Sequence, residues 1–289
     1  MRQDGNKPLI EFQVITDTHV TADPDHLYNR NFEQALKDIA AGAPDSVGIM
    51  HAGDVTDHGF PGEYEELRRI VGLYKDKLPP IYMATGNHDV GLGIWESRLG
   101  SFLAATGMSA AYHDHWIEGY AFFFLGTEQG LELFCDLSEA QLEWLDAKLE
   151  EAAKSGKPAF VFLHQPLMNT TAGSMEEQKW YGVTQDDELK AILAKYPRTF
   201  LFTGHGHWEM EAPRNHAGGE GGLPAMFNAA SVAYLWTDED VRREGSQGYY
   251  VEVYEDWVLV KGRDFTTGTW VGSAQYEVSL GPVISVRES

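Results

Sequence analysis

The sequence contains little cysteine, little positive charge and no long apolar run. Its single cysteine, Cys135, excludes an internal disulfide framework and any zinc site built from several thiolates. No apolar segment approaches the ~18 residues that a membrane-spanning helix requires, so we expect no membrane span. The first eight residues lack the apolar core of a signal peptide, so we expect a cytoplasmic protein unless a leader has been removed.

Positive charge is scarce relative to negative charge. Lys and Arg together number 22, whereas Asp and Glu number 44, which gives a formal net charge of −22. So acidic a protein repels the phosphates of nucleic acids, which excludes a coat protein for DNA or RNA and disfavours a nuclease. An enzyme whose site holds metal cations remains compatible with this charge, because bound ions dominate the local field.

The order of the apolar segments predicts an α/β protein. Residues 9–15, 47–50 and 80–84 are apolar enough for short buried strands, and the apolar residues between them recur at helical spacing. This β-α-β-α-β order indicates a largely parallel sheet. Two further buried strands are expected at 159–163 and 199–202.

The C-terminal part has a different pattern. Between about residues 225 and 280, short apolar segments alternate with turns and no helical spacing is evident. We expect these segments to form antiparallel strands that complete a second sheet. No linker-like stretch separates them from the rest, so residues 1–289 are predicted to form a single domain.

Clusters of Asp, Asn and His follow five of the predicted strands. Each cluster alone has an ordinary structural explanation, but all five lie where open α/β sheets bind ligands, at the carboxyl ends of strands. Oxygen and imidazole ligands without thiolate suit Mn, Fe, Zn, Ni or Co. Seven such ligands are too many for one ion, and two ions sharing a carboxylate are the simplest arrangement. The candidate ligands are Asp17, His19, Asp54, Asn87, His164, His205 and His207.

These clusters also match a known family in order and spacing. Asp17-x-His19, Gly53-Asp54, Gly86-Asn87-His88-Asp89, His164 and Gly204-His205-x-His207 resemble the motifs of the calcineurin-like metallophosphoesterases, across about two thirds of the chain. The resemblance implies two mixed β-sheets packed as a sandwich and flanked by helices. It also implies a centre of two metal ions, for which we expect Mn, Fe or Zn.

The resemblance further assigns a role to each residue. It implies that one ion is held by Asp17, His19 and His207, that the other is held by Asn87, His164 and His205, and that Asp54 bridges them. It also implies that His88 protonates the leaving oxygen and that Asp57 orients His88 and tunes its charge. A histidine poised near neutral pH suits this proton transfer.

Departures from the family pattern bear on the substrate. Protein Ser/Thr phosphatases of this fold carry arginines where His58 and Thr85 stand here, so two clamps for a phosphomonoester are missing. Segments 59–64, 137–145 and 263–268 resemble the bacterial cyclic-nucleotide phosphodiesterase-like branch. We therefore expect a hydrolase of a small phosphodiester such as a cyclic nucleotide. A phosphomonoesterase and a non-catalytic metal-binding scaffold stay open as alternatives, as does a homo-oligomer.

Overall fold

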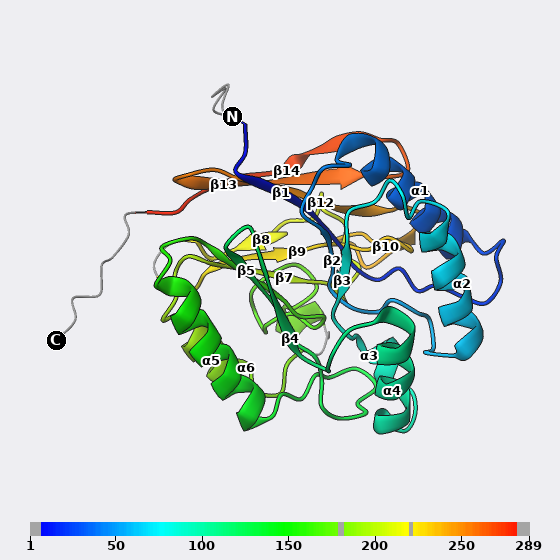
Figure 1. Cartoon of the computed structure of the whole chain (residues 1–289), viewed down its shortest axis with the longest axis horizontal. Helices are drawn as coiled ribbons and strands as arrows, with labels where there is room; N and C mark the ends of the chain where they lie inside the picture. Colours follow the sequence, from blue (N-terminus) through cyan, green and yellow to red (C-terminus); the bar gives the residue numbers. More distant parts are fainter. Residues whose placement is uncertain (1–6, 179–181, 220–221, 282–289) are drawn as a thin grey trace.

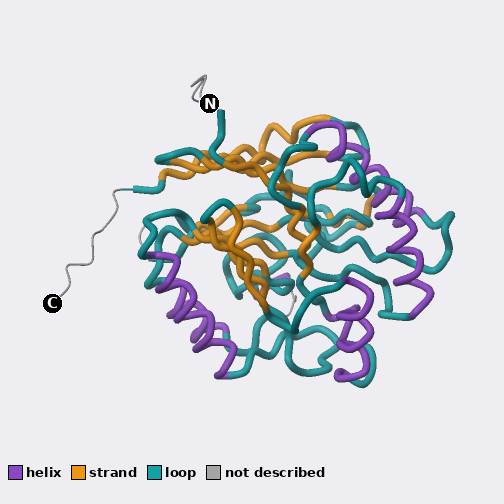
Figure 2. Tube along the Cα trace, viewed as in Figure 1, coloured by secondary structure: helices purple, strands orange, loops and turns teal. Residues whose placement is uncertain are grey.

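Two β-sheets lie face to face, and helices cover their outer faces (Figure 1 and Figure 2). The computed structural model describes residues 7–178, 182–219 and 222–281 of the 289. Both sheets have six strands and mix parallel with antiparallel pairs. The predicted α/β sandwich is therefore confirmed. In the described part of the chain, no helix has the length and apolar character needed to cross a bilayer.

The first sheet combines the N-terminal and C-terminal strands. Its order is β14-β13-β12-β1-β2-β3, in which β1, β2 and β3 are parallel and β12 runs antiparallel to β1. Helices α1, α2 and α4 pack against its outer face. The elements are β1 (Ile10–Ile15), α1 (Leu27–Gly42), β2 (Ile49–His51), α2 (Pro61–Gly72), β3 (Ile81–Met83), α3 (Asn87–Val90), α4 (Trp95–Thr106), β12 (Gln247–Val253), β13 (Trp257–Asp264) and β14 (Thr269–Ser279).

The second sheet has the order β4-β5-β6-β7-β9-β8, and β5, β6, β7 and β9 are parallel. Helices α5 and α6 pack against its outer face. A separate pair, β10 with β11, follows this sheet in sequence. The elements are β4 (His113–Ile117), β5 (Tyr120–Phe124), α5 (Glu139–Ala153), β6 (Ala159–Phe162), η1 (Glu176–Gln178), α6 (Asp186–Leu193), β7 (Thr199–Thr203), β8 (His216–Ala217), β9 (Ala225–Asn228), β10 (Leu235–Trp236) and β11 (Arg242–Arg243).

The placement of the C-terminal strands corrects one prediction. We expected the strands after about residue 225 to be antiparallel and to complete the second sheet. Of these strands only β9 joins that sheet, where it is parallel to β7. The meander β12-β13-β14 is antiparallel as expected, but it extends the first sheet from β1. Apolar alternation predicts that a strand exists, but it does not encode which open sheet edge accepts it.

Aromatic side chains fill the space between the sheets. Phe12 of β1 is fully buried and contacts rings from the opposite sheet, with centroids 5.2 Å from Phe122 and 4.7 Å from Phe160, edge to face in both cases. Such pairs add about 0.5–1.5 kcal/mol each beyond the area they bury. This contact fixes the two sheets against each other, which places the ends of their parallel strands at a common edge.

Candidate metal centre

Backbone strain concentrates in the loops that follow strands β1, β2 and β7. Asp17, His19, Asp54, His205 and His207 all have positive φ, between 43° and 68°. A non-glycine residue in this left-handed region is uncommon and costs free energy, and such residues cluster at functional sites. Five of the seven predicted ligands share this conformation, so the loops are bent to aim these side chains inward.

The loops from both sheets are hydrogen bonded to one another. The Asp17 N–H donates to the Gly53 carbonyl at 3.0 Å, which ties the ends of β1 and β2. The Asp17 Oδ2 atom accepts a hydrogen bond from the main-chain N–H of His205 at 3.0 Å, which ties the end of β1 to the end of β7 in the other sheet. The predicted ligands therefore meet across the joint between the two sheets.

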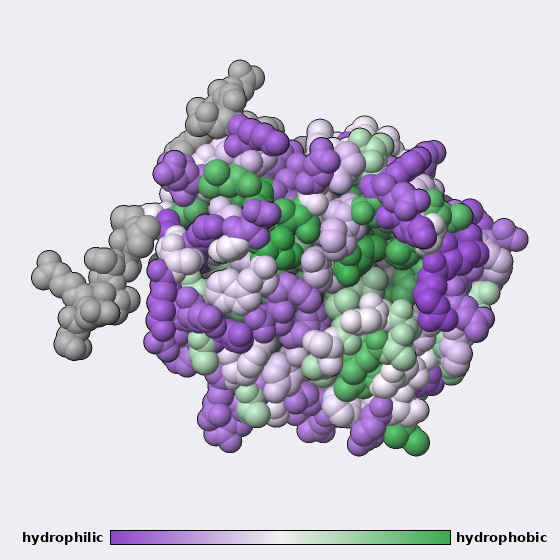
Figure 3. All heavy atoms as spheres, in the orientation of Figure 1, coloured by the Kyte–Doolittle hydropathy of each residue, from purple (hydrophilic) through white to green (hydrophobic). Residues whose placement is uncertain are grey.

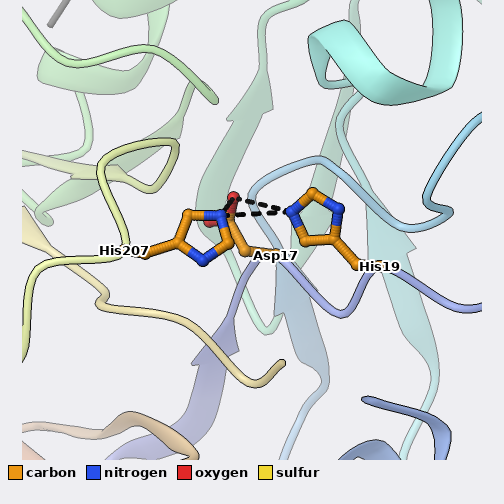
Figure 4. Close-up of side chains that lie close together, drawn as sticks. All are labelled: Asp17, His19 and His207. Carbon is orange, nitrogen blue, oxygen red and sulfur yellow. Dashed lines mark hydrogen bonds and ion pairs between the residues drawn. The ribbon is translucent and has the colours of Figure 1, made fainter. Parts of the chain in front are cut away.

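The first group of side chains consists of Asp17, His19 and His207 (Figure 4). All three are buried, and one ligand atom from each lies within 4.8 Å of the others. The Asp17 Oδ1 atom is 3.0 Å from His207 Nε2 and 3.6 Å from His19 Nε2. The two imidazole Nε2 atoms are 3.1 Å apart, so the three side chains converge on one small volume.

The second group consists of Asp54, His164 and His205, again buried and within 4.8 Å. The Asp54 Oδ2 atom lies 3.0 Å from His164 Nε2 and also 3.7 Å from His19 Nε2, which belongs to the first group. Asn87 joins here, because its Oδ1 atom is 3.1 Å from His205 Nδ1. Asp54 thus lies between the two groups, and Asp17 Oδ1 also comes within 3.9 Å of His164 Nε2.

Hydrogen bonds on the far side of the rings fix their orientation. Nδ1 of His19 lies 3.1 Å from Asp57 Oδ1, Nδ1 of His164 lies 3.0 Å from the Ala52 carbonyl, and Nδ1 of His207 lies 3.2 Å from the Tyr234 carbonyl. When Nδ1 carries the proton in such contacts, Nε2 presents a lone pair to the interior. Metal-binding histidines are commonly held in this way.

The electrostatics of the centre follow from burial and close opposite charges. Burial alone would lower the pKa of His19, but interactions with Asp17 and Asp57 outweigh it and raise that pKa to about 10. Burial likewise opposes the charged form of His164, yet Asp54 and Asp17 raise its pKa to about 9. The field of these buried carboxylates therefore favours positive charge at this point.

The donor set fits two metal ions. The Asp17 Oδ1 and His164 Nε2 atoms are fully buried and form no hydrogen bond of normal geometry among the described residues. Burial lowers the pKa of His205 to about 3, so its imidazole is neutral, as a ligand must be. Carboxylate, amide and imidazole donors in two groups joined by Asp54 suit the ions named above.

His88 is near the centre but is held differently. Its ring is 4.6 Å from the His19 ring, edge to face, and it is only partly buried. Its Nδ1 atom lies 2.6 Å from the Asp57 carbonyl, and the main-chain N–H of His88 donates to Asp54 Oδ1 at 2.8 Å. The ring is therefore held by a main-chain carbonyl, and one of its nitrogens lies within 4.8 Å of ligand atoms of His19 and Asp54.

The position of Asp57 differs from the expected one. We expected its carboxylate to act on His88, but Oδ1 lies 3.1 Å from His19 Nδ1 and Oδ2 lies 3.1 Å from His58 Nδ1. Only the main-chain carbonyl of Asp57 reaches His88.

Sequence reasoning did not identify the aromatic residues beside the centre. The Tyr234 ring lies 4.2 Å from the His207 ring, and Tyr28 stacks on Tyr234 at 5.4 Å. Gln165 was also missed, although its Nε2 atom approaches Asn87 Oδ1 at 3.4 Å. No motif marks the two tyrosines, because they come from segments far apart in the sequence. For Gln165 the only signal was its place directly after His164.

The chain is similar in sequence to known phosphoesterases. The family model described as calcineurin-like phosphoesterase matches residues 11–209. A probable cyclic nucleotide phosphodiesterase from Fibrobacter succinogenes is 26% identical over 221 residues, covering 73% of this chain and 77% of the relative. A 3',5'-cyclic-nucleotide phosphodiesterase from Nostoc is 23% identical over 98% of this chain and 99% of its own. The human serine/threonine-protein phosphatase CPPED1 is 26% identical over 71% of this chain and 66% of its own.

Solved structures share the fold. A dimetal phosphatase from Danio rerio superimposes with a TM-score of 0.70 at 14% identity, covering 95% of this chain and all of that one. A purple acid phosphatase from yellow lupin gives a TM-score of 0.66 at 13% identity and covers 95% of this chain and 54% of that one. At these identities the likeness concerns the fold alone.

Proposed function

Because the chain belongs to the calcineurin-like phosphoesterase family, we propose that it hydrolyses a small phosphodiester, such as a cyclic nucleotide, with two metal ions. The observation that carries this proposal is the position of Asp54, whose Oδ2 atom lies within 3.7 Å of imidazole nitrogens from both groups. Two cations bound there would neutralise phosphoryl oxygens and make a nucleophile of water near neutral pH. Asp17, His19 and His207 would hold one, and Asn87, His164 and His205 the other.

The protein's own residues supply the remaining proton chemistry. The Asp57 carbonyl fixes Nδ1 of His88, which leaves Nε2 to carry a proton toward substrate. As the bond from phosphorus to the leaving oxygen breaks, this proton passes from His88 Nε2 to that oxygen. The leaving group then departs as a neutral alcohol, which removes the cost of releasing an alkoxide.

A diester is favoured over a monoester by the charge around the centre. A monoester is a dianion and needs more positive charge than the monoanion of a diester. His58 stands where related protein phosphatases carry an arginine, and its ring is paired with Glu63 at 3.2 Å. Thr85 stands at the second such position and is buried. The similarity to CPPED1, named as a phosphatase, supports a phosphomonoesterase as the second candidate.

The metal content of the purified protein tests the first part of this proposal. After reconstitution with Mn or Zn, elemental analysis should give about two ions per chain, because each of the two donor groups is predicted to hold one ion. Asp54→Asn should remove more metal than any other single ligand change, because its carboxylate is the one predicted to bridge both ions. Asp146→Asn, on the far helix α5 and paired with Lys195, is the matched control. A stoichiometry of one or zero would refute the dinuclear centre.

Substrate pairs test the second part. The loaded enzyme should give a higher kcat/KM with bis(4-nitrophenyl) phosphate than with 4-nitrophenyl phosphate, and cyclic nucleotides should be screened in parallel. A strong monoester preference with two ions bound would favour the phosphatase candidate. Two bound ions without turnover of either ester would support the scaffold alternative.

A further inference from the structure

A cavity of about 310 Å³ opens beside the predicted metal centre. It is bordered by the start of α1, which includes Tyr28, and by Tyr234. Arg242, Arg243 and Glu244, from the segment that includes β11, complete its lining. A space of this size accommodates a small organic group. None of these residues belongs to the predicted ligand set, so the cavity is a separate feature of the surface.

Two tyrosines form the wall between this cavity and the metal centre. The Tyr234 ring lies 4.2 Å from the ring of His207 and 6.1 Å from that of His19. The Tyr28 ring lies 6.2 Å from that of His19 and is stacked on Tyr234. A molecule whose phosphoryl group is held among His19 and His207 would therefore extend past these rings into the cavity.

Arg242 is the cation at this wall. Its Nη2 atom donates to the Tyr28 hydroxyl at 2.6 Å, and its guanidinium carbon lies 4.5 Å above the Tyr234 ring. Among the described residues it forms no ion pair with a carboxylate, whereas the adjacent Arg243 is paired with Glu209 and Glu211. In a chain of net charge −22, an exposed arginine held only by neutral partners is available to an anionic ligand.

His88 does not border the cavity, although both lie beside His19. His88 packs edge to face on the His19 ring and is held by the Asp57 carbonyl, whereas Tyr28 and Tyr234 line the cavity and lie 6.2 and 6.1 Å from that ring. If His88 protonates the leaving group, the group that enters the cavity is the substituent that remains on phosphorus. Glu244, which is exposed, also borders the cavity.

We propose that the cavity lined by Tyr28, Tyr234 and Arg242 binds the retained ester substituent of the substrate, and that this substituent carries its own anionic group, such as a carboxylate or a phosphate. Among small phosphodiesters this favours an acyclic one over a cyclic nucleotide, whose only charge is on the reacting phosphoryl group. This inference rests on the proposed phosphodiesterase function. The guanidinium offers planar, paired donors that match such a group, and the aromatic rings hold it in place. The subsite thus selects among diesters by charge at a point beyond the reacting phosphorus.

A matched pair of esters tests this subsite on the full, metal-loaded chain. The first is 4-nitrophenyl 3-carboxypropyl phosphate, and the second is 4-nitrophenyl butyl phosphate, in which a methyl group replaces the carboxylate. The wild-type ratio of kcat/KM should favour the carboxylate. Arg242→Gln should lower that ratio roughly 10- to 100-fold, the range expected for a charged hydrogen-bonded pair. Arg242→Lys should retain part of the preference, since it keeps the positive charge but loses the planar, paired donors of the guanidinium.

A control isolates the subsite from general charge effects. Arg68→Gln removes the same charge from the exposed face of α2 and should leave the ratio unchanged. If Arg242→Gln reduces both esters equally, Arg242 acts on the phosphoryl group or on the fold, and the subsite is refuted. Absence of a carboxylate preference in the wild type would refute it as well.

Binding separates failure of this inference from failure of the proposed function. Calorimetry with the corresponding phosphonates, in which CH2 replaces the oxygen to the nitrophenyl group, needs no turnover. If neither ester is hydrolysed, the phosphodiesterase proposal fails. The carboxylate-bearing phosphonate should still bind more tightly than the butyl one, and this difference should disappear in Arg242→Gln. Equal binding of the two phosphonates to the wild type would overturn the subsite.

Discussion

At the scale of single residues, the centre depends on which ring nitrogen faces inward. His19, His164 and His207 each use Nδ1 for a contact outside the centre, with a carboxylate in one case and main-chain carbonyls in the others. His88 uses Nδ1 in the same way but is only partly buried. The same local arrangement would thus provide ligands where the ring is enclosed and a proton donor where it is more exposed.

The acid role of His88 gives the first prediction. His88→Ala should lower kcat by about 10²- to 10⁴-fold, the usual contribution of general acid catalysis. The loss should be smaller for a nitrophenolate leaving group, which needs little protonation, than for an alkyl alcohol. Metal content should stay unchanged in elemental analysis. Equal slowing of good and poor leaving groups would instead indicate that His88 binds phosphoryl oxygens.

The observed position of Asp57 gives a different prediction for its carboxylate. Because it contacts His19 Nδ1, Asp57→Asn should weaken the affinity for the ion held by His19 by about 10- to 100-fold, as loss of such an outer partner does. Titration with Mn while activity is followed would measure this. The dependence of rate on leaving group should match that of the wild type. A changed leaving-group dependence with normal metal affinity would restore the role first expected for Asp57.

At the scale of elements, the strand ends approach one another so closely that side chains are excluded. A Cβ atom on Gly86, between β3 and α3, would lie 2.1 Å from Asp54 Oδ1 and 2.3 Å from the Asp54 nitrogen. The φ of Gly86 is −112°, which any residue can adopt, so the requirement for glycine here is purely steric. The space that a methyl group would need is occupied by the carboxylate predicted to bridge the ions.

Gly86→Ala should therefore displace Asp54. We expect loss of most bound metal and destabilisation of about 1–3 kcal/mol, typical of overpacking. Gly100→Ala is a matched control, because its Cβ atom would meet nothing within 4 Å and the residue lies inside helix α4. That change should stabilise the protein by about 0.5–1 kcal/mol. Elemental analysis and denaturant unfolding measure the two effects, and normal metal content in Gly86→Ala would contradict the argument.

At the scale of the whole molecule, negative charge dominates. Hydrophilic side chains cover most of the face shown in Figure 3, with smaller hydrophobic areas between them. The net charge of −22 attracts divalent cations from solution and repels polyanions. Small anionic substrates must then find a local positive field, which the predicted ions and the guanidinium of Arg242 would provide.

The buried carboxylates also predict how stability depends on metal and pH. After chelation, His19 and His164 must satisfy Asp17 and Asp54 as imidazolium ions, with pKa values raised to about 10 and about 9. A raised pKa contributes stability that is complete below the unfolded value of about 6.5 and is lost as pH rises through the folded value. Bound ions replace this contribution and need neutral imidazoles.

The difference in Tm between the Mn-loaded and the chelated protein should therefore widen as pH rises from about 7 to 9. Calorimetry of both forms at equal ionic strength would measure it, and the comparison cancels titrations common to both. His113, whose pKa burial lowers to about 4, lies outside the ligand set, and His113→Gln is the control that should leave the difference unchanged. A difference that narrows with pH would contradict the metal assignment.

Much of this protein was predictable from local sequence. The buried segments before Asp17, Asp54, Asn87, His164 and His205 indicated strands, and the polar clusters after them indicated a site at one sheet edge. These features are local because a strand end and the loop after it are adjacent in sequence. The candidate metal donors could be identified for the same reason, since each motif carries its candidate ligands within a few residues.

Other features were decided only by the tertiary structure. The meander β12-β13-β14 joined the first sheet, because β1 offered it an antiparallel partner that its alternation of polarity does not specify. The Asp57 carboxylate turned to His19 because their separation depends on how the loops after β1 and β2 pack. Tyr28, Tyr234 and Arg242 form one wall although more than 200 residues separate the first from the last. Sequence determines which groups a loop carries, whereas the packing of the two sheets determines which groups meet.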